Sequence, residues 1–333
     1  MQGYIYPNEF ELQWSLLIVI YPYLTGLVAG AFILASLAKV FNVVEVQPTY
    51  RLSLLTALAF LLIAPLPLLV HLGHPERSYE MFLTPNPRSA MAMFGFVYTW
   101  YLMVVLLLEI WFDYRKDLVV WSRGATGPMA WVRRLLTLGS TDLSERALRF
   151  DRRAGKFITI VGIPSAFLLH GYVGFIFGSI KANPWWSSVL MPVVFLFSAI
   201  VSGIALMLVI YFFTTMLRSK PVDMACMDKL GAFLLYALIV DFSLEMLDFT
   251  QRLYEAEESI GILREMLQNR LVVSLVILQV FVGTIVPLVT LFLIAPTVRK
   301  AGFLRVPDEF RRLLYFVVAV LVQIGIFSTR WNV

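Results

Sequence analysis

The amino-acid sequence predicts an all-α protein, a polytopic membrane helical bundle of about eight transmembrane helices. Hydrophobic residues make up 59% of the 333 residues, charged residues only 15%, and the mean hydropathy is +0.79. A soluble domain carries roughly 25% charged residues. The apolar stretches are about 20 residues or longer, which suits membrane helices rather than barrel strands. Composition therefore places the chain in a membrane.

The predicted spans follow one another along a single integral membrane domain, residues 1–333. Glu9 and Glu11 precede the first apolar run, which is too long for a signal-peptide core, so we expect it to be retained as a span. The fifth span is long enough to tilt or to project beyond the lipid. The first five spans form one half of the bundle, about 14–217, and the last three a second half, about 229–330. The spans are at about 14–41, 52–73, 90–112, 157–180, 186–217, 229–254, 270–296 and 311–330.

Basic residues set the predicted orientation. With the N-terminus outside, 20 Lys and Arg residues fall on the inner side and 7 on the outer side. Because Lys and Arg favour cytoplasmic loops, we predict this orientation in a prokaryotic cytoplasmic membrane. Ten of the inner basic residues lie in the connection 113–156, which we expect to be a cytoplasmic loop whose segment 131–138 (WVRRLLTL) can lie in the interface as an amphipathic turn. The net charge of +5 thus reflects topology and gives no support to nucleic-acid binding.

The cysteines and histidines limit the metal chemistry that the chain can support. Cys226 is the only cysteine, whereas an iron–sulfur cluster needs about four thiolates. The three histidines are not stacked along two helices, as they are in four-helix cytochromes b. We therefore predict no metal site, and a haem b between His170 and either His71 or His74 is the alternative that geometry leaves open. No glycine motif for phosphate binding lies in a strand–helix context, so nucleotide chemistry is unsupported.

Polar side chains from three spans converge at the same outer level of the predicted bundle. Such groups are costly at membrane depth unless they line a site or find partners, so they indicate function. An aromatic-belt position for Tyr172 and an interfacial cap for His71 are the structural alternatives. Gly171 and Gly174 beside Tyr172 allow close packing and favour its burial. The convergent side chains are Tyr21, Tyr23 and Thr25 in the first span, His71 and His74 at the end of the second, and His170 and Tyr172 in the fourth.

Three carboxylates occupy one stripe of the sixth span. Asp241, Glu245 and Asp248 have i, i+4, i+7 spacing and share a helix face. They cannot all be ionised in a low dielectric without partners, and such a stripe suits a proton relay. The alternative is that Glu245 and Asp248 reach the outer interface and are hydrated. Glu109 and Asp113, at the inner end of the third span, are expected to be solvated.

Three motifs carry a resemblance to the NrfD family, the membrane subunits of polysulfide reductase-type complexes. The motifs are HLGHPERSYEMFLTPN (71–86), HGYVGFIFGSIKANPWWSSVLMPVVFLFSAIVSG (170–203) and the ending STRWNV (328–333). The chain is most similar to the larger branch of the family, found in sulfite-reduction-associated complexes and in the membrane subunit of hydrogenase-2. This resemblance implies a menaquinone or ubiquinone site near the outer face, between the first four helices, facing a docked ferredoxin-like iron–sulfur subunit.

The resemblance also assigns a residue. In eight-helix members a Tyr before a Gly on the fourth helix binds the quinone headgroup, and Tyr172 in the sequence Tyr–Val–Gly matches that pattern. Two elements depart from the family. His71 stands where the family has Asp in an Asp–Leu–Gly–Arg–Pro element, which leaves the proton acceptor open, and the first span lacks the Asn and His of the short members. Larger relatives continue with two more helices past an Arg–Trp–Asn–Val segment, so a shortened ten-helix relative is an alternative to an eight-helix member.

The expected function is a quinone-reactive subunit that exchanges two electrons with an extracytoplasmic iron–sulfur partner, in sulfur-compound or hydrogen metabolism. The redox reaction would belong to the complex, with further cytochrome or catalytic subunits, and the chain alone would be inactive. Tyr172, His71, His74, Tyr21 and Thr25 are the expected binding residues. His170 or His71 would exchange a proton, since imidazole titrates nearest neutral pH, and proton translocation is left open. A secondary transporter with carboxylates at the midplane and a passive membrane anchor are the rival functions.

Overall fold

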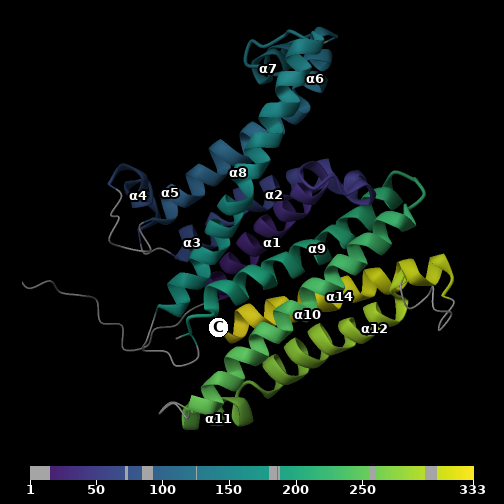
Figure 1. The fold of residues 1–333 in the computed structure, drawn as a ribbon. Helices are drawn as coiled ribbons and strands as arrows, with labels where there is room; N and C mark the ends of the chain where they lie inside the picture. Colours follow the sequence, from purple (N-terminus) through teal and green to yellow (C-terminus); the bar gives the residue numbers. More distant parts are fainter. Residues whose placement is uncertain are drawn as a thin grey trace, which may run out of the picture.

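Eight helices that are long and apolar enough to cross a membrane run through the described residues (Figure 1). This confirms the predicted fold class and number of spans. The computed structural model describes residues 16–71, 74–84, 93–124, 126–179, 186, 188–255, 260–296 and 306–333. The spans are α1 (Leu16–Lys39); η1 (Val44–Thr49) with α2 (Tyr50–Ile63) and α3 (Pro65–His71); α5 (Phe94–Thr99) with η3 (Trp100–Leu107) and α6 (Leu108–Arg123); α8 (Glu145–Gly178); α9 (Met191–Leu217); α10 (Met224–Glu255); η4 (Val272–Ile285) with α12 (Val286–Ile294); and α14 (Asp308–Asn332).

Within the described residues, four short helices connect the spans: η2 (Pro75–Arg77), α4 (Glu80–Leu83), α7 (Pro128–Leu136) and α11 (Ile260–Asn269). Pro65 explains why the second span is divided, because a proline cannot donate a helical hydrogen bond and α2 gives way to α3 at Ala64. We call the end of the bundle where α1 begins and α14 ends the terminal face. The opposite end, where α6 and α8 project, is the arm face.

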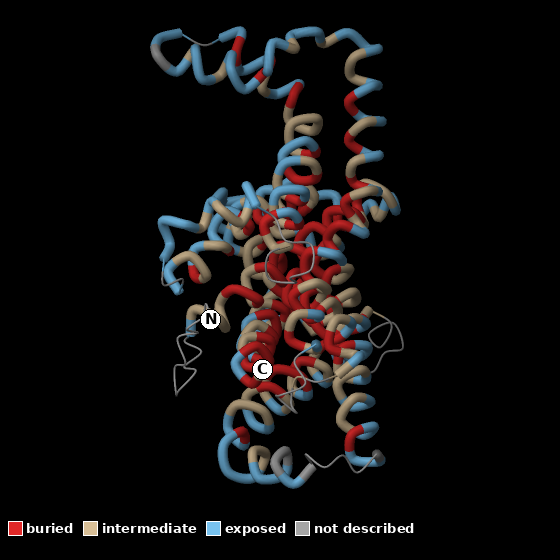
Figure 2. Tube along the Cα trace, turned by 90° about the vertical axis from the view of Figure 1, so that its left-hand side faces the viewer, coloured by how far each residue is buried: buried red, intermediate tan, exposed pale blue. Residues whose placement is uncertain are grey.

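α9 is the central helix of the bundle. It packs against α1 and α8 on one side and against α10 and α14 on the other, so it joins the two groups of helices. α1 also contacts α2 and α14, and α14 packs along η4 and α12. The buried residues gather where these helices meet (Figure 2). This arrangement brings the last span, far away in sequence, next to the first.

Two pairs of glycines allow the closest helix crossings. A Cβ atom on Gly203 of α9 would lie 2.3 Å from the carbonyl carbon of Gly30 on α1, and one on Gly283 of η4 would lie 2.2 Å from the Cα of Gly325 on α14. Helices in lipid associate mainly through such close packing, since apolar side chains gain little by leaving lipid for protein. At each of these two crossings, a side chain on the glycine would collide with the facing backbone.

Gly203→Ala is expected to destabilise the protein by about 1–3 kcal/mol, because the added methyl group must push two backbones apart. Gly171→Ala is the matched control, since its Cβ would meet no atom closer than 4.0 Å. Thermal unfolding in detergent measures the difference. Equal melting temperatures for the two variants would show that the crossing does not limit stability.

The third and fourth spans continue into an arm that projects from the arm face (Figure 1). The predicted loop over 113–156 and the predicted start of the fourth span at 157 are both corrected here. α6 runs to Arg123, α7 forms over the predicted amphipathic segment, and α8 begins at Glu145. Hydropathy misses the first turns of α8 because they are highly charged. The local signal is the N-cap, where the Ser144 hydroxyl accepts a hydrogen bond from the Ala147 amide at 3.3 Å.

The expectation that Glu109 is solvated was wrong. Its side chain is 0% exposed, at the base of the arm, where it accepts hydrogen bonds from Thr159 of α8 at 2.7 Å and from Tyr50 of α2 at 3.2 Å. The Lys39 ammonium of α1 lies 3.8 Å from Glu109 and donates to Asp113 at 2.6 Å. These opposite charges compensate one another inside the bundle, so four spans are joined by polar contacts at this end.

Candidate functional site

The polar constellation nearest the terminal face centres on His170 of α8. Its side chain is 0% exposed, and its ring stacks on Phe195 of α9 with centroids 5.7 Å apart. Nδ1 lies 3.3 Å from the Thr25 hydroxyl of α1, and Nε2 lies 3.2 Å from a guanidinium nitrogen of Arg330 on α14. Four spans therefore meet at one imidazole.

The partners of His170 fix its tautomer. Arg330 can only donate hydrogen bonds, so Nε2 must be the unprotonated acceptor, and the ring proton lies on Nδ1. Nδ1–H then donates to the Thr25 oxygen, whose own hydroxyl hydrogen is directed at the carbonyl groups of Tyr21 and Pro22, each 3.2 Å away. His170 is thus a neutral base held between a fixed donor and a fixed acceptor.

Arg330 is a buried cation, although the predicted topology counts it among the basic residues of the outer side. It is 2% exposed, lies with Cζ 3.9 Å from the centroid of the Phe195 ring, and donates to the Ser198 hydroxyl. Within the described part of the chain, its Nε and Nη1 atoms have no hydrogen-bond partner. Asp241 and Glu245 of α10 interact with it electrostatically. The positive charge is thus compensated by carboxylates on another helix without a direct ion pair between them.

The three carboxylates of α10 occupy different surroundings. Asp241 is buried, and its Oδ1 atom has no hydrogen-bond partner among the described residues. Both oxygens of Glu245 accept from the Gln279 amide at 3.2 Å, and Asn332 donates in turn to Gln279 at 2.8 Å. Asp248 lies further toward the terminal face, where it accepts from the Ser188 hydroxyl and from Arg252 at 3.0 Å. The stripe therefore runs from an unpaired buried acid to a salt-bridged one.

A cavity of about 330 Å³ adjoins this stripe. Its polar lining comes from Glu245, Asp248 and Arg252 of α10, with Gln279 and Asn332. Its apolar wall includes Phe195, the ring that also contacts His170 and Arg330. Since a cavity needs only polar partners and modest volume to hold water, it can hydrate the carboxylate end of the constellation.

Tyr21 and Tyr172 lie on the α1–α8 side of the same region. Tyr21 is buried and packs edge-on against Phe94, with ring centroids 5.5 Å apart. The Tyr172 hydroxyl is buried and has no hydrogen-bond partner within the described residues, and the two phenols interact electrostatically. Tyr23 differs from both, because its hydroxyl donates to Gln323 at 2.7 Å. An unpaired buried phenol is costly unless a ligand or water completes it.

The structure places the remaining predicted site residues at the surface. His71 is exposed at the end of α3, and His74, whose side chain is 75% exposed, lies 3.0 Å from Glu76. The described structure gives neither of them a contact with His170. Among the described residues, no group of three or more His, Cys, Asp or Glu side chains is arranged to hold a metal ion.

Sequence reasoning missed the role of Arg330 and of Asn332, both in the STRWNV ending. The signal was present in that motif, since an Arg and an Asn at the end of an otherwise apolar span are costly unless they are paired inside the bundle. The partners on α8 and η4 lie 160 and 53 residues away along the chain. Only the fold reveals them.

Comparisons with known proteins assign the chain to a family of membrane proteins. The family described as "Polysulphide reductase, NrfD" matches residues 7–333. A selenate reductase subunit of Mesobacillus selenatarsenatis is 31% identical over 96% of this chain and 72% of the relative. A putative dimethyl sulfoxide reductase membrane subunit of Halobacterium salinarum is 29% identical over 67% of this chain, and the Hdr-like menaquinol oxidoreductase integral membrane subunit of Archaeoglobus fulgidus 22% over 64%. The chain spans about half the length of these last two relatives, 48% and 45%.

Proposed function

Because the chain belongs to the NrfD family of multi-pass membrane proteins, we propose that it is the quinone-reactive membrane subunit of a respiratory redox complex. It exchanges electrons between the membrane quinone pool and an extracytoplasmic iron–sulfur subunit, in sulfur-compound or hydrogen metabolism. The observation that carries the proposal is the His170 constellation, a neutral base inside the bundle with a buried cation and two carboxylates behind it. A relative named as a menaquinol oxidoreductase subunit supports the choice of ligand.

The residues present fit a quinone headgroup. A quinone presents two carbonyl oxygens on a flat apolar ring, and it supplies an exchange of two electrons and two protons with its surroundings. The unpartnered Tyr172 hydroxyl is a donor for such an oxygen, and Phe94 and Tyr21 provide aromatic surroundings. We assign Tyr172, Tyr21 and Thr25 to binding, and we keep the exposed His71 and His74 as further candidate contacts of the quinone.

His170 is the proton-exchanging group in this proposal. Its Nδ1 proton is held on the Thr25 side, toward the helix that carries Tyr21, and Nε2 faces Arg330. A proton gained at the ring must weaken the Arg330 hydrogen bond, because both groups then carry only donors. Protonation at His170 is thus coupled to the position of the Arg330 charge.

Asp241, Glu245 and Asp248 form the proposed relay between Arg330 and the terminal face. Displacement of the Arg330 charge changes how strongly the ionised forms of Asp241 and Glu245 are stabilised. A proton gained at His170 therefore favours the release of a proton from these carboxylates. The cavity beside Glu245 and Asp248 offers the water through which that proton can leave or enter. Each group in the relay is a residue of this chain.

Electrons require a partner, because one cysteine cannot hold an iron–sulfur cluster. A ferredoxin-like subunit on the terminal face, with further cytochrome or catalytic subunits, completes the proposed complex. The rival functions make different predictions. A secondary transporter works alone in liposomes and is indifferent to quinone analogues, whereas a passive anchor co-purifies with redox subunits but shows no quinone dependence.

Tyr172→Phe tests the binding assignment. The variant is expected to assemble normally, since no described residue bonds to the hydroxyl, and to lose up to about tenfold in quinone turnover for one missing hydrogen bond. Tyr23→Phe is the matched control, because it deletes a phenol whose bond to Gln323 lies outside the site. Purified complex assayed with quinone analogues measures both. Unchanged turnover in the Tyr172 variant would reject its role.

A further inference from the structure

The arm carries an apolar face that no described residue covers. On α7, Trp131 and Leu135 follow one another at i, i+4 spacing, and Leu138 lies two residues beyond the end of the helix; the three side chains are 69%, 55% and 70% exposed. The Arg133 guanidinium is directed the other way and lies 5.4 Å from the centre of the Trp121 ring on α6. Scattered exposed hydrophobic residues are ordinary, but a contiguous stripe on a nine-residue helix indicates a binding surface.

The end of α7 lies close to the membrane-spanning part of the protein. The Trp111 indole donates to the Leu136 carbonyl at 3.1 Å, and Trp111 is only three residues into α6 from Leu108. Beside it, Glu109 is already enclosed in the bundle. This hydrogen bond therefore ties the end of α7 to the first turn of α6, next to the enclosed Glu109.

The lipid-facing side of α8 extends into the arm as well. Phe150, Phe157 and Ile160 are exposed and share one face of this helix. Arg146 and Arg153 lie on the same face, Arg146 beyond Phe150 at the arm end and Arg153 between Phe150 and Phe157. Apolar side chains in line with a membrane span, followed by arginines, are typical of a helix that leaves the bilayer through the headgroup layer.

The charge of the arm complements an anionic lipid surface. Between residues 113 and 156, eight of the ten basic side chains are exposed, against three of the five acidic ones. Each Lys or Arg near an anionic membrane surface adds to the electrostatic attraction between the arm and the lipid. The exposed basic residues are Lys116, Arg123, Arg134, Arg146, Arg149, Arg152, Arg153 and Lys156, and the exposed acidic residues are Asp117, Asp142 and Glu145.

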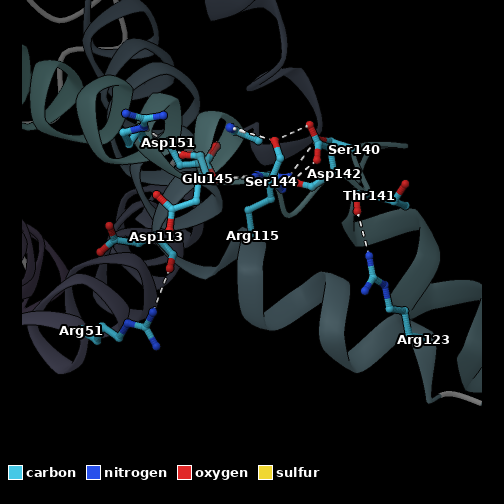
Figure 3. A network of polar contacts seen from close by, with 12 residues as sticks. Arg51, Asp113, Arg115, Arg123, Ser140, Thr141, Asp142, Ser144, Glu145 and Asp151 are labelled. Carbon is cyan, nitrogen blue, oxygen red and sulfur yellow. Dashed lines mark hydrogen bonds and ion pairs between the residues drawn. The ribbon is translucent and has the colours of Figure 1, made fainter.

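A polar network, with Arg115 and Asp151 buried at its centre, joins α6, α8 and the segment between α7 and α8 (Figure 3). Arg115 of α6 donates from Nε to Asp151 of α8 at 2.8 Å and from Nη1 to the carbonyl of Asp142 at 2.7 Å, and its Nη2 atom lies 2.6 Å from the Asp151 carboxylate. Hydrogen bonds from the Ser144 amide and hydroxyl hold the pKa of Asp142 below its usual value, which keeps this carboxylate charged at the N-cap of α8. The segment between α7 and α8 is thereby bound to both α6 and α8. These contacts set the orientation of the apolar stripe.

We propose that α7 and the adjoining faces of α6 and α8 bind the anionic phospholipid surface on the arm side of the membrane, with Trp131, Leu135 and Leu138 inserted at the boundary between headgroups and acyl chains. An amphipathic helix with an apolar face and a basic flank binds lipid in this way. The arm then anchors the third and fourth spans, and the far half of the fourth span carries His170 and Tyr172.

An environment-sensitive label tests the proposal in the full chain. In a Cys226→Ala background, which removes the only cysteine, Leu135→Cys and Thr141→Cys are each labelled with a nitrobenzoxadiazole dye. Thr141 is the matched control, because it is exposed in the connection beyond the stripe. The proteins are reconstituted into phosphatidylcholine vesicles with or without phosphatidylglycerol.

The label at position 135 is expected to shift its emission to the blue in phosphatidylglycerol vesicles and to be quenched by shallow spin-labelled lipids, while the label at position 141 stays in water. Arg149→Glu with Arg153→Glu should reduce the dependence on phosphatidylglycerol and leave bundle stability unchanged. A label at position 135 that stays in water in both vesicles overturns the proposal. If the label at position 135 stays in water in both vesicles but is shielded from water in native membranes, the stripe binds a protein partner instead.

Discussion

Arg330→Gln is expected to lower quinone turnover at least about 100-fold and to destabilise the subunit by about 3–5 kcal/mol. The guanidinium donates to Nε2 of His170 and to Ser198, and it compensates Asp241 and Glu245. Its removal leaves buried carboxylates without their cation. Removal of one member of a buried charge group is far more disruptive than replacement of the whole group.

A double-variant cycle separates charge from packing at this position. Arg330→Gln combined with Asp241→Asn removes one charge of each sign, so it should recover most of the lost stability but not the turnover. Arg330→Lys is the second control, since it keeps the charge but not the planar donor group that spans His170 and Ser198. Thermal unfolding and quinone-dependent electron transfer of the purified complex measure the two effects. A double variant as unstable as the single one would contradict the charge argument.

The fold could be predicted because hydropathy depends on local sequence alone. Eight apolar runs imply eight helices in lipid, whatever their partners. The start of α8 could not be found in this way, since its first turns face away from the lipid core and are charged; there the Ser144 cap carries the information. Helix positions that hydropathy determines were thus predicted correctly, whereas the helix start that an N-cap determines was not.

A residue of the candidate site could be predicted only where a polar side chain is improbable at that depth in the predicted membrane span. His170 and Asp241 meet that condition, and both are buried in the structure. Glu109 and Arg330 lie near span ends, where solvation is the ordinary expectation, and their burial follows from partners on other helices: Lys39 for the first, and His170 and Asp241 for the second. Such pairing between residues far apart in the chain follows no periodic pattern, so it cannot be inferred from a single sequence.

His170→Gln should separate the structural role of the imidazole from its role in proton exchange. A glutamine carries one amide donor group and one carbonyl acceptor, so it can still satisfy Thr25 and Arg330, but it cannot take up a proton. We expect an assembled complex whose quinone turnover is reduced about 10²–10⁴-fold, the range of positioned acid–base groups. His170→Leu, which removes the acceptor for Arg330 as well, should also lose stability.

The pH profile of turnover gives the sharpest reading of this comparison. If His170 exchanges the proton, the residual activity of the Gln variant loses the part of the pH dependence that the imidazole imposes on the parent complex. Thr25→Val is the matched positioning control, because it leaves the titratable ring in place and removes the acceptor of Nδ1–H together with the local hydroxyl bonds to the Tyr21 and Pro22 carbonyls. Its turnover should fall less, because the unpaired buried donor costs about 1–3 kcal/mol. The pH profile of its turnover should keep the shape of the parent profile. A Gln variant with parental rate and profile would move the proton-exchanging role to another group, with His71 the next candidate.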